Sequence, residues 1–218
     1  MITPELIQEW LKSEDLGDRL RAVNQMRDID PAVAFEMIQT AVVDSDTRVR
    51  YAAVSQLSSL GKQDLDKSLE LLRDRLQTDP EADVQAAAAD AIGGLQLKQA
   101  FPELKQLYAQ TSEWLVKMSI VAALGELAEP EGFDLLADAL QDENELIQTV
   151  AIGSLGELGN LQAVPLLTPY VTKDDWQIRY RVAQALGKLG GEEAQAALKQ
   201  LAEDKTAPVA EAAKSALN

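Results

Sequence analysis

Two segments of the sequence place an arginine directly before a tyrosine in the same frame. They are Arg50–Tyr51 and Arg179–Tyr180, and each pair follows an acidic segment and an aliphatic residue. A guanidinium binds carboxylates through two parallel hydrogen bonds, and a tyrosine offers a flat apolar ring with a polar tip. The two pairs therefore indicate either a structural device or a binding surface.

The sequence offers few side chains for acid–base or nucleophilic chemistry. Its 218 residues include no cysteine and no histidine, which excludes disulfides, thiol nucleophiles, thiolate-zinc sites and imidazole catalysis. Any catalysis would rest on carboxylates, lysine, arginine, tyrosine or serine, and we assign no catalytic residue. The acidic runs DSD, TDPEAD and QDENE lack the glycine and the ligand spacing of a calcium loop. We therefore expect no metal site and no bound cofactor.

The charge balance narrows the choice of partners. The chain has 36 acidic and 20 basic residues, a net charge of −16, whereas nucleic-acid binding requires a basic surface. No apolar run approaches the roughly 20 residues of a membrane span. The first residues, MITPELIQEW, include neither a basic leader nor a signal-peptide core. We expect a cytoplasmic protein that neither binds nucleic acid nor inserts into a membrane.

A repeat of about 31 residues runs through the whole chain. We take as its anchor the residue before Arg50 and the equivalent residue of every other copy. The anchors are Asp18, Val49, Val84, Val116, Ile147, Ile178 and Val209. Each copy reads as two helical halves joined by an acidic elbow, and no alternating strand pattern competes with this reading. The repeat predicts an all-α, right-handed α-solenoid of seven helix pairs, which forms a single domain over residues 1–218.

Start and stop signals mark the two halves of each repeat. First halves begin with Thr-Pro, Asp-Pro or similar dipeptides, which suit helix N-caps. Second halves run into Gly125, Gly156, Gly187 and Asn218, which we expect to be left-handed C-caps. In the second helix, the anchor and the residues four and eight later share one face, and most of them are aliphatic or small. That face is the predicted core.

The opposite face of the second helices contains aromatic residues in a chain with only 5% aromatics. Residues two before and two after the anchor point away from the core. Because second helices commonly line the concave side of a solenoid, we expect Tyr51, Met118 and Tyr180 in one row along a groove. Trp114 and Trp176 would flank this row. The alternative is that each ring packs locally, the tryptophans over a neighbouring elbow and the tyrosines with only their hydroxyls in water.

The arginines divide into two sets. Arg50 and Arg179 follow the anchor directly, and we expect them to form a structural ladder with elbow acids of adjacent repeats rather than a binding site. Arg21 and Arg181 lie three residues after the anchor, nearer the groove, where a binding role and a structural role are both open. The acids available for the ladder are Asp44, Asp46, Asp83, Glu145, Asp174 and Asp175.

The repeat unit, an acidic elbow followed by V-R-x-A-A-x-x-A-L-G, resembles the short HEAT-like repeats of the E/F-type phycobilin lyases. RVRYAAVSQL and IRYRVAQALGKLG carry this likeness. The seven-repeat layout and the segments SLELLRDRL, DPEADVQAAAADAIG, GFDLL and EDKTAPVAEAAKSAL resemble the phycobilisome degradation proteins of the non-bleaching protein B type. The resemblance implies a cyanobacterial protein, peripheral at the thylakoid-bound phycobilisome. Its implied partners are phycobiliproteins (phycocyanin or allophycocyanin), their phycobilin, or both.

Two functions follow from these observations. The resemblance implies a phycobilisome turnover factor that binds phycobiliproteins and assists the detachment or transfer of their bilin chromophores, with or without catalysis. A bilin has two propionates on a conjugated tetrapyrrole, which arginine and aromatic side chains match. The alternative is a non-catalytic HEAT-repeat scaffold for protein–protein interaction. In either case the predicted groove residues are Arg21, Tyr51, Trp114, Met118, Trp176, Tyr180 and Arg181.

Overall fold

The chain is an array of helix pairs. The computed structural model describes residues 2–218, and this part of the chain contains fourteen α-helices, five short 3-10 helices and no β-strand. The predicted all-α solenoid of seven helix pairs is confirmed. The helices group into two compact units: unit 1 extends to Ala123, and unit 2 covers Leu124–Asn218. We describe each unit separately.

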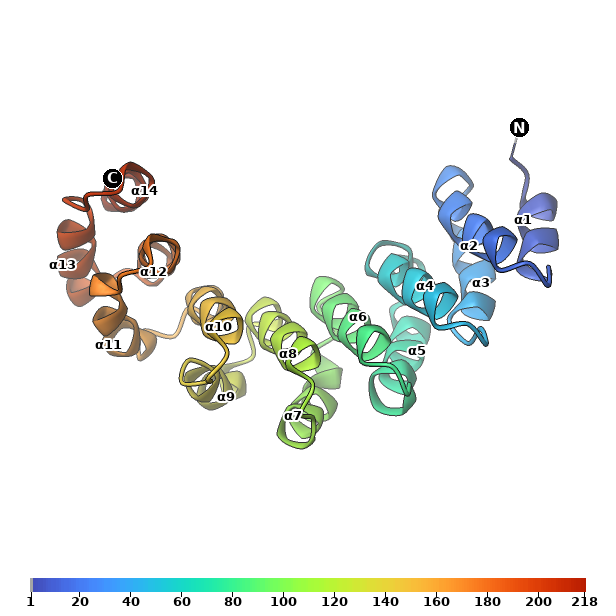
Figure 1. Cartoon of the computed structure of the whole chain (residues 1–218), viewed down its shortest axis with the longest axis horizontal. Coiled ribbons are helices and arrows are strands. Elements are labelled where there is room, and N and C mark those ends of the chain that lie inside the picture. Colours follow the sequence, from blue (N-terminus) through green and yellow to red (C-terminus); the bar gives the residue numbers. More distant parts are fainter. Residues whose placement is uncertain (1) are drawn as a thin grey trace. The chain divides into compact units, whose positions relative to one another are not determined.

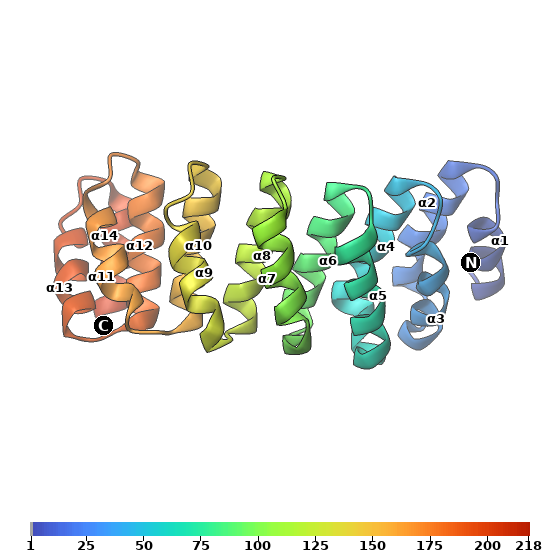
Figure 2. The ribbon, with the colours of Figure 1, turned by 90° about the horizontal axis from the view of Figure 1, so that it is seen from below.

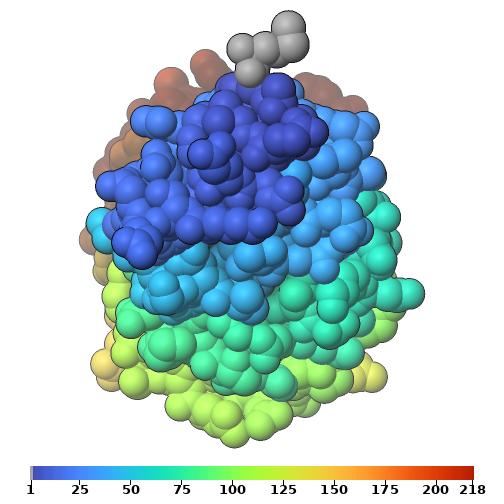
Figure 3. Space-filling view, turned by 90° about the vertical axis from the view of Figure 1, so that its right-hand side faces the viewer, coloured from blue at the N-terminus to red at the C-terminus, as the bar shows by residue number. Residues whose placement is uncertain are grey.

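Unit 1 contains the first three helix pairs and most of the fourth. Its second helices α2, α4 and α6 pack one on the next, and the first helices α3 and α5 lie on the other side of this row (Figure 1). Figure 3 shows the side chains of the first pair, in the deepest blue, forming one end of the unit. The helices are α1 (Pro4–Leu11), α2 (Leu16–Gln25), α3 (Pro31–Ala41), α4 (Thr47–Leu60), α5 (Leu65–Thr78), α6 (Ala82–Gly94), α7 (Phe101–Gln110) and α8 (Trp114–Leu127), with 3-10 turns η1 (Met26–Asp28), η2 (Gly61–Gln63) and η3 (Lys98–Ala100).

Unit 2 repeats the same arrangement. Helices α10, α12 and α14 pack in succession, and each also contacts its own first helix; Figure 2 shows these helices side by side. The elements are η4 (Pro130–Gly132), α9 (Phe133–Ala139), α10 (Glu145–Leu158), α11 (Ala163–Leu167), η5 (Thr168–Thr172), α12 (Trp176–Leu189), α13 (Glu192–Leu201) and α14 (Ala207–Leu217).

The first residues of the helices follow the N-cap residues that the sequence indicates. The Thr3 side chain accepts a hydrogen bond from the Leu6 amide, and Asp30 accepts from the amides of Ala32 and Val33. A proline follows each of these caps at the first helical position, where its missing N–H costs nothing. The predicted Thr-Pro and Asp-Pro starts are confirmed.

The core is the predicted face of the second helices. The anchor and the residues four and eight later are buried in α4, α8 and α12, with exposed fractions of 7% or less. Each buried Val, Leu or Ile contributes about 1.5–3 kcal/mol of transfer free energy. A single helix pair cannot cover this face, so neighbouring pairs must stack. The nine residues are Val49, Ala53, Leu57, Val116, Ile120, Leu124, Ile178, Val182 and Leu186.

Three glycines that the sequence suggested as C-caps lie instead inside their helices. Gly125, Gly156 and Gly187 are each two residues before the helix end. A Cβ on Gly156 would lie 2.8 Å from the Cα of Ala185 on the next second helix, and one on Gly187 would lie 2.7 Å from the Cβ of Ala216. The C-cap prediction is therefore wrong for these glycines. They are small because successive second helices approach closely at this level.

Glycines just beyond the helix ends provide the turns. Gly159 follows α10 with φ of 72°, and Gly190 follows α12 with φ of 70°. Both values lie in the region that glycine adopts without a steric penalty. The capping signal was present in the sequence, but a few residues later than expected.

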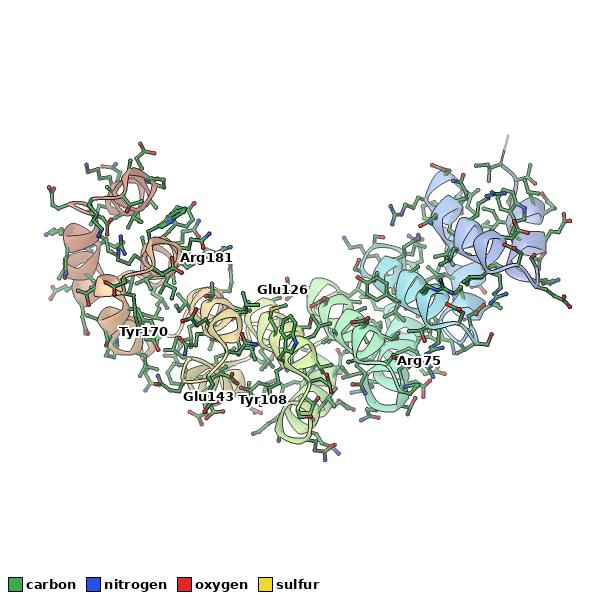
Figure 4. All side chains as sticks on the ribbon, in the orientation of Figure 1. Arg75, Tyr108, Glu126, Glu143, Tyr170 and Arg181 are labelled. Carbon is green, nitrogen blue, oxygen red and sulfur yellow. The ribbon has the colours of Figure 1, made fainter. Side chains whose placement is uncertain are left out.

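A repeated arginine–aspartate contact joins the elbow of one repeat to that of the next. Arg50 donates from Nε and Nη2 to the two carboxylate oxygens of Asp79, at 2.8 and 3.0 Å. Its Nη1 donates to the backbone carbonyls of Asp44 and Ser45 in its own elbow, at 3.0 and 3.2 Å. Arg75 donates to the same Asp79 carboxylate at 3.1 Å (Figure 4). One guanidinium thus holds two successive elbows.

Unit 2 contains the same contact. Arg179 donates to both oxygens of Asp204, at 2.6 and 3.0 Å, and to the carbonyls of Lys173 and Asp174, at 2.6 and 2.8 Å. Arg179 is only 4% exposed. These contacts give Arg179 a structural role, the same role that Arg50 has in unit 1.

The aspartates that accept hydrogen bonds from Arg50 and Arg179 are not the ones that the sequence suggested. Of the acids we considered, Asp44 accepts from Arg19 at 2.9 Å, but Arg50 and Arg179 contact Asp79 and Asp204. These two aspartates lie five residues before the next anchor. Each carboxylate also accepts a hydrogen bond from the backbone amide two residues later. The turn therefore orients the carboxylate toward the guanidinium of the arginine.

Candidate functional site

A cavity of about 380 Å³ opens between three second helices of unit 1. It is lined from α4, α6 and α8, and its surface is mostly apolar with a few polar groups, as is common for ligand sites. The lining residues are Thr47, Arg48, Tyr51, Asp83, Ala86, Ala87, Asp90, Leu115, Met118 and Ser119.

The hollow arises from a change of residue size at one position of the repeat. Two residues after the anchor, α4 has Tyr51 and α8 has Met118, whereas α6 has Ala86. Ala87 follows as a second small residue, and both alanines are almost fully buried. The small side chains of α6 therefore form a floor, and the larger ones on either side form walls.

One wall presents an aromatic ring and a cation. Tyr51 is 49% exposed. The Arg48 side chain is 68% exposed, and it donates from Nε and Nη2 to the two carboxylate oxygens of Asp46, the N-cap of α4, at 3.2 and 3.1 Å. Because this pair is exposed, it contributes little stability, and a ligand carboxylate can compete with Asp46 for the guanidinium.

The floor presents a carboxyl group with an unusual environment. Asp90 lies on α6 with an exposed side chain, yet the surrounding protein partly desolvates it and raises its pKa above the ordinary value. The Ser119 hydroxyl donates a hydrogen bond to the carboxylate, which acts in the opposite direction. A carboxyl that keeps solvent access while its charged form is disfavoured is suited to proton exchange.

The structure brings two of the predicted groove residues to this cavity, Tyr51 and Met118. Trp114 lies on α8 directly before Leu115; it is 48% exposed and does not line the cavity. Arg21 lies in the first pair, where its guanidinium stacks 5.3 Å from the Trp10 ring and 3.7 Å from Asp18. The Arg21 side chain stays 59% exposed beside these contacts, and its binding role stays a prediction.

The remaining predicted residues lie on α12 in unit 2. Trp176 is 43% exposed, and the Tyr180 hydroxyl accepts a hydrogen bond from Gln184 at 3.1 Å. Arg181 is exposed on α12 (Figure 4) and lines a small pocket beside the Lys188–Glu157 ion pair. The binding role of all three stays a prediction.

Sequence reasoning missed the polar residues of the cavity. Arg48 and Asp90 were not selected, and Asp83 was considered only as an acid of the arginine ladder, because exposed charges in an acidic chain are usually solvated. A usable signal was present, because Ala86 of α6 stands at the groove position where the neighbouring repeats have Tyr51 and Met118. In the described residues there is no cluster of three or more potential metal ligands, and no helix there is long and apolar enough to cross a membrane.

Comparison with known families matches the sequence to HEAT repeats over residues 3–93, 69–155 and 133–218. The chain belongs to the HEAT-repeat family. The matched ranges extend over nearly the whole sequence, in agreement with the seven helix pairs. A search of curated proteins gives no match.

Solved structures share this HEAT-repeat fold. The complex of CpcE and CpcF of phycocyanin lyase from Nostoc aligns with a TM-score of 0.67 and 23% identity, covering 100% of this chain and 94% of that chain. The E. coli protein YibA aligns with a TM-score of 0.73 and 18% identity, covering 98% and 80%. An engineered protein aligns with a TM-score of 0.61 and 19% identity, covering 98% and 66%. These likenesses show the fold.

Proposed function

We propose that this HEAT-repeat protein binds phycobiliproteins and assists the detachment or transfer of their bilin chromophores during phycobilisome turnover. The observation that carries the proposal is the cavity of α4, α6 and α8, where a cation, an aromatic ring, a thioether and two carboxyl groups surround an alanine floor. The fold likeness to the phycocyanin lyase subunits supports bilin chemistry as the setting. The sequence resemblance to non-bleaching protein B supports turnover.

The cavity matches the separate parts of a bilin. Arg48 at the rim would bind a propionate through its two-pronged fork, in place of Asp46. Tyr51 and Met118 would contact the conjugated rings, since aromatic and thioether groups pack well on flat π-systems. The cavity is smaller than a whole tetrapyrrole and open to solvent, so it would hold part of a bilin while the rest stays with the phycobiliprotein.

Detachment of a thioether-linked bilin requires proton movement but no oxidant. A base removes a proton from the carbon next to the linked carbon, a C=C bond forms, and the C–S bond breaks. The cysteine thiolate that leaves then takes up a proton. Because the chain has no histidine and no cysteine, a carboxylate, a lysine, a tyrosine or the solvent would exchange these protons.

The test uses the full-length protein and holo-phycocyanin or holo-allophycocyanin. Bilin absorbance and fluorescence are followed over time at several protein concentrations, with bovine serum albumin at equal mass as the control. We expect a loss of native bilin fluorescence that depends on time and on protein concentration. If the spectra stay constant and the two proteins do not co-migrate on gel filtration, the proposal fails.

A scaffold function has one observation in its favour. In unit 2, Leu146 on α10 and Trp176 on α12 are 55% and 43% exposed near the beginnings of their helices. Exposed large apolar side chains in neighbouring repeats are typical of protein contact surfaces. Co-migration with a phycobiliprotein without any spectral change would favour this second function.

A further inference from the structure

The cavity of α4, α6 and α8 has a charge that a bilin anion alone would not match. Its rim and floor present Asp83 and Asp90 against one cation, Arg48, which already has Asp46 beside it. A ligand that brought only propionates would be repelled by the floor while it was attracted at the rim. The floor is therefore complementary to a ligand region with N–H donors or positive charge.

Asp90 is placed to meet that region. It lies on the same floor as Ala86 and Ala87, between the walls that Tyr51 and Met118 form. None of the α6 residues that line the cavity is basic. From α8, the Ser119 hydroxyl forms a hydrogen bond with the Asp90 carboxylate. The other charged or titratable groups of the lining are Arg48 and Tyr51 from α4 and Asp83 from α6. The Asp90 carboxylate thus has room for a donor from a ligand.

The ring system of a bilin provides such donors. Three of its pyrrole-type nitrogens have N–H groups, and the fourth, imine-type nitrogen can take up a proton to give a conjugated cation. The propionates of the same molecule are on the ring edge. A bilin whose edge lies at Arg48 would therefore turn ring nitrogens toward the alanine floor, where Asp90 lies.

We propose that Asp90 is the proton-exchanging group of this cavity, and that the cavity selects the protonated, N–H-donating form of a tetrapyrrole. This inference rests on the proposed function. When a neutral bilin meets protonated Asp90, the Asp90 O–H bond breaks and an N–H bond forms at the imine nitrogen, which leaves a carboxylate beside a cationic ring system. When Asp90 is already ionised, the proton comes from solvent and the same ion pair results.

An ion pair with the ligand would offset the desolvation that disfavours the charge of Asp90 in the empty site. Desolvation raises the pKa of Asp90 when no cation is near, and a ligand cation would remove that disadvantage. Binding and protonation are then coupled, so the bound bilin should stay protonated at a higher pH than the free bilin.

The test titrates free phycobilin, prepared from phycocyanin, with the full-length protein from mildly acidic to mildly basic pH. Bilin absorbance reports both binding and ring protonation, because protonation strengthens and red-shifts the long-wavelength band. With the wild-type protein, we expect the protonation midpoint of the bound bilin to lie above that of the free bilin. Asp90→Asn should weaken binding about tenfold or more, through loss of a charge-assisted hydrogen bond, and should return the midpoint to that of free bilin.

Two further variants separate Asp90 from general effects. Asp83→Asn removes the same charge from the same cavity and should lower the midpoint less than Asp90→Asn, because Asp83 is not the group that exchanges the proton. Ser119→Ala removes the hydrogen bond that favours ionised Asp90, so the ion pair should weaken and the midpoint should move toward that of free bilin. Circular dichroism verifies that each variant keeps its helices.

The outcomes are distinguishable. If Asp90→Asn binds bilin with unchanged affinity and midpoint, or if Asp83→Asn has the same effect as Asp90→Asn, the inference is wrong and the proposed function stands. If the wild-type protein binds no free bilin but binds phycocyanin without spectral change, the proposed function fails and the inference falls with it.

Discussion

At the residue scale, two arginines of one helix illustrate how burial sets a role. Arg48 and Arg50 both lie in the first turn of α4, but their side chains are 68% and 8% exposed. Arg50 is enclosed by its own elbow carbonyls and by Asp79, which has no exposed side-chain surface. Arg48 points into solvent at the cavity rim. The buried arginine is committed to structure, and the exposed one is available to a ligand.

The first prediction compares these two arginines. Arg50→Ala leaves the buried Asp79 carboxylate with only Arg75 as a cation partner and should cost about 3 kcal/mol, the lower end for breaking a buried pair. Arg48→Ala removes an exposed pair and should cost less than about 1 kcal/mol. Urea unfolding of both variants measures the difference. Equal destabilisation by the two substitutions would contradict the ladder.

The second prediction concerns acid stability. Hydrogen bonding from Arg179 lowers the pKa of Asp204 to about 2, against the effect of its burial. Because the folded pKa is below the unfolded value of about 3.9, the pair stabilises the fold fully above that value and loses its effect as pH falls through about 2. We expect the stability difference between the wild-type protein and Asp204→Asn, measured by urea midpoints, to shrink steadily below about pH 4. A difference independent of pH would show that Asp204 is not ionised in the fold.

Some of the roles of individual residues could be predicted from the sequence. The location of Arg50 and Arg179 beside the core followed from the helical period, because position on a helix fixes direction. The identity of Asp79 and Asp204 did not follow, since it depends on how each elbow turns. Asp90 was missed for a similar reason: whether a carboxylate lies in open solvent or on a cavity floor depends on the sizes of residues in neighbouring repeats.

At the element scale, the stacking of second helices depends on small residues at one level. Gly156 on α10 faces the backbone of Ala185 on α12, whereas a Cβ added at Gly153, less than one turn away on α10, would meet nothing within 4 Å. The sequence alone does not distinguish these two glycines, because both lie on the same helix. Only the packing shows which one faces the neighbouring helix. Helix existence and pairing were predictable because the apolar period is long and regular.

The third prediction uses this pair of glycines. Gly156→Ala should destabilise unit 2 by about 1–3 kcal/mol, because the added methyl group overpacks the α10–α12 contact. Gly153→Ala should be neutral or stabilising by up to about 1 kcal/mol, because alanine is the better helix former and nothing obstructs it. Thermal unfolding of the two variants measures both effects. A stabilising Gly156→Ala would contradict the close approach.

At the scale of the whole molecule, the repeats form two compact units whose boundary in sequence falls inside α8. The single domain that the sequence suggested stays a prediction. In repeat proteins each repeat is stabilised mainly by its neighbours, so we expect one calorimetric unfolding transition for the full chain. Two resolved transitions, each altered by substitutions in only one unit, would contradict a single domain.

The central claim for the whole molecule is that the cavity of α4, α6 and α8 receives a bilin. Ala86→Leu fills the alanine floor without changing any charge, and Ala109→Leu adds the same side chain at an exposed position of α7. Free phycobilin is titrated with the wild-type protein and with each variant, while absorbance reports binding and circular dichroism reports helicity. We predict binding by the wild-type protein and Ala109→Leu, and binding at least about tenfold weaker by Ala86→Leu with unchanged helicity. Equal bilin affinity for all three proteins would contradict the claim.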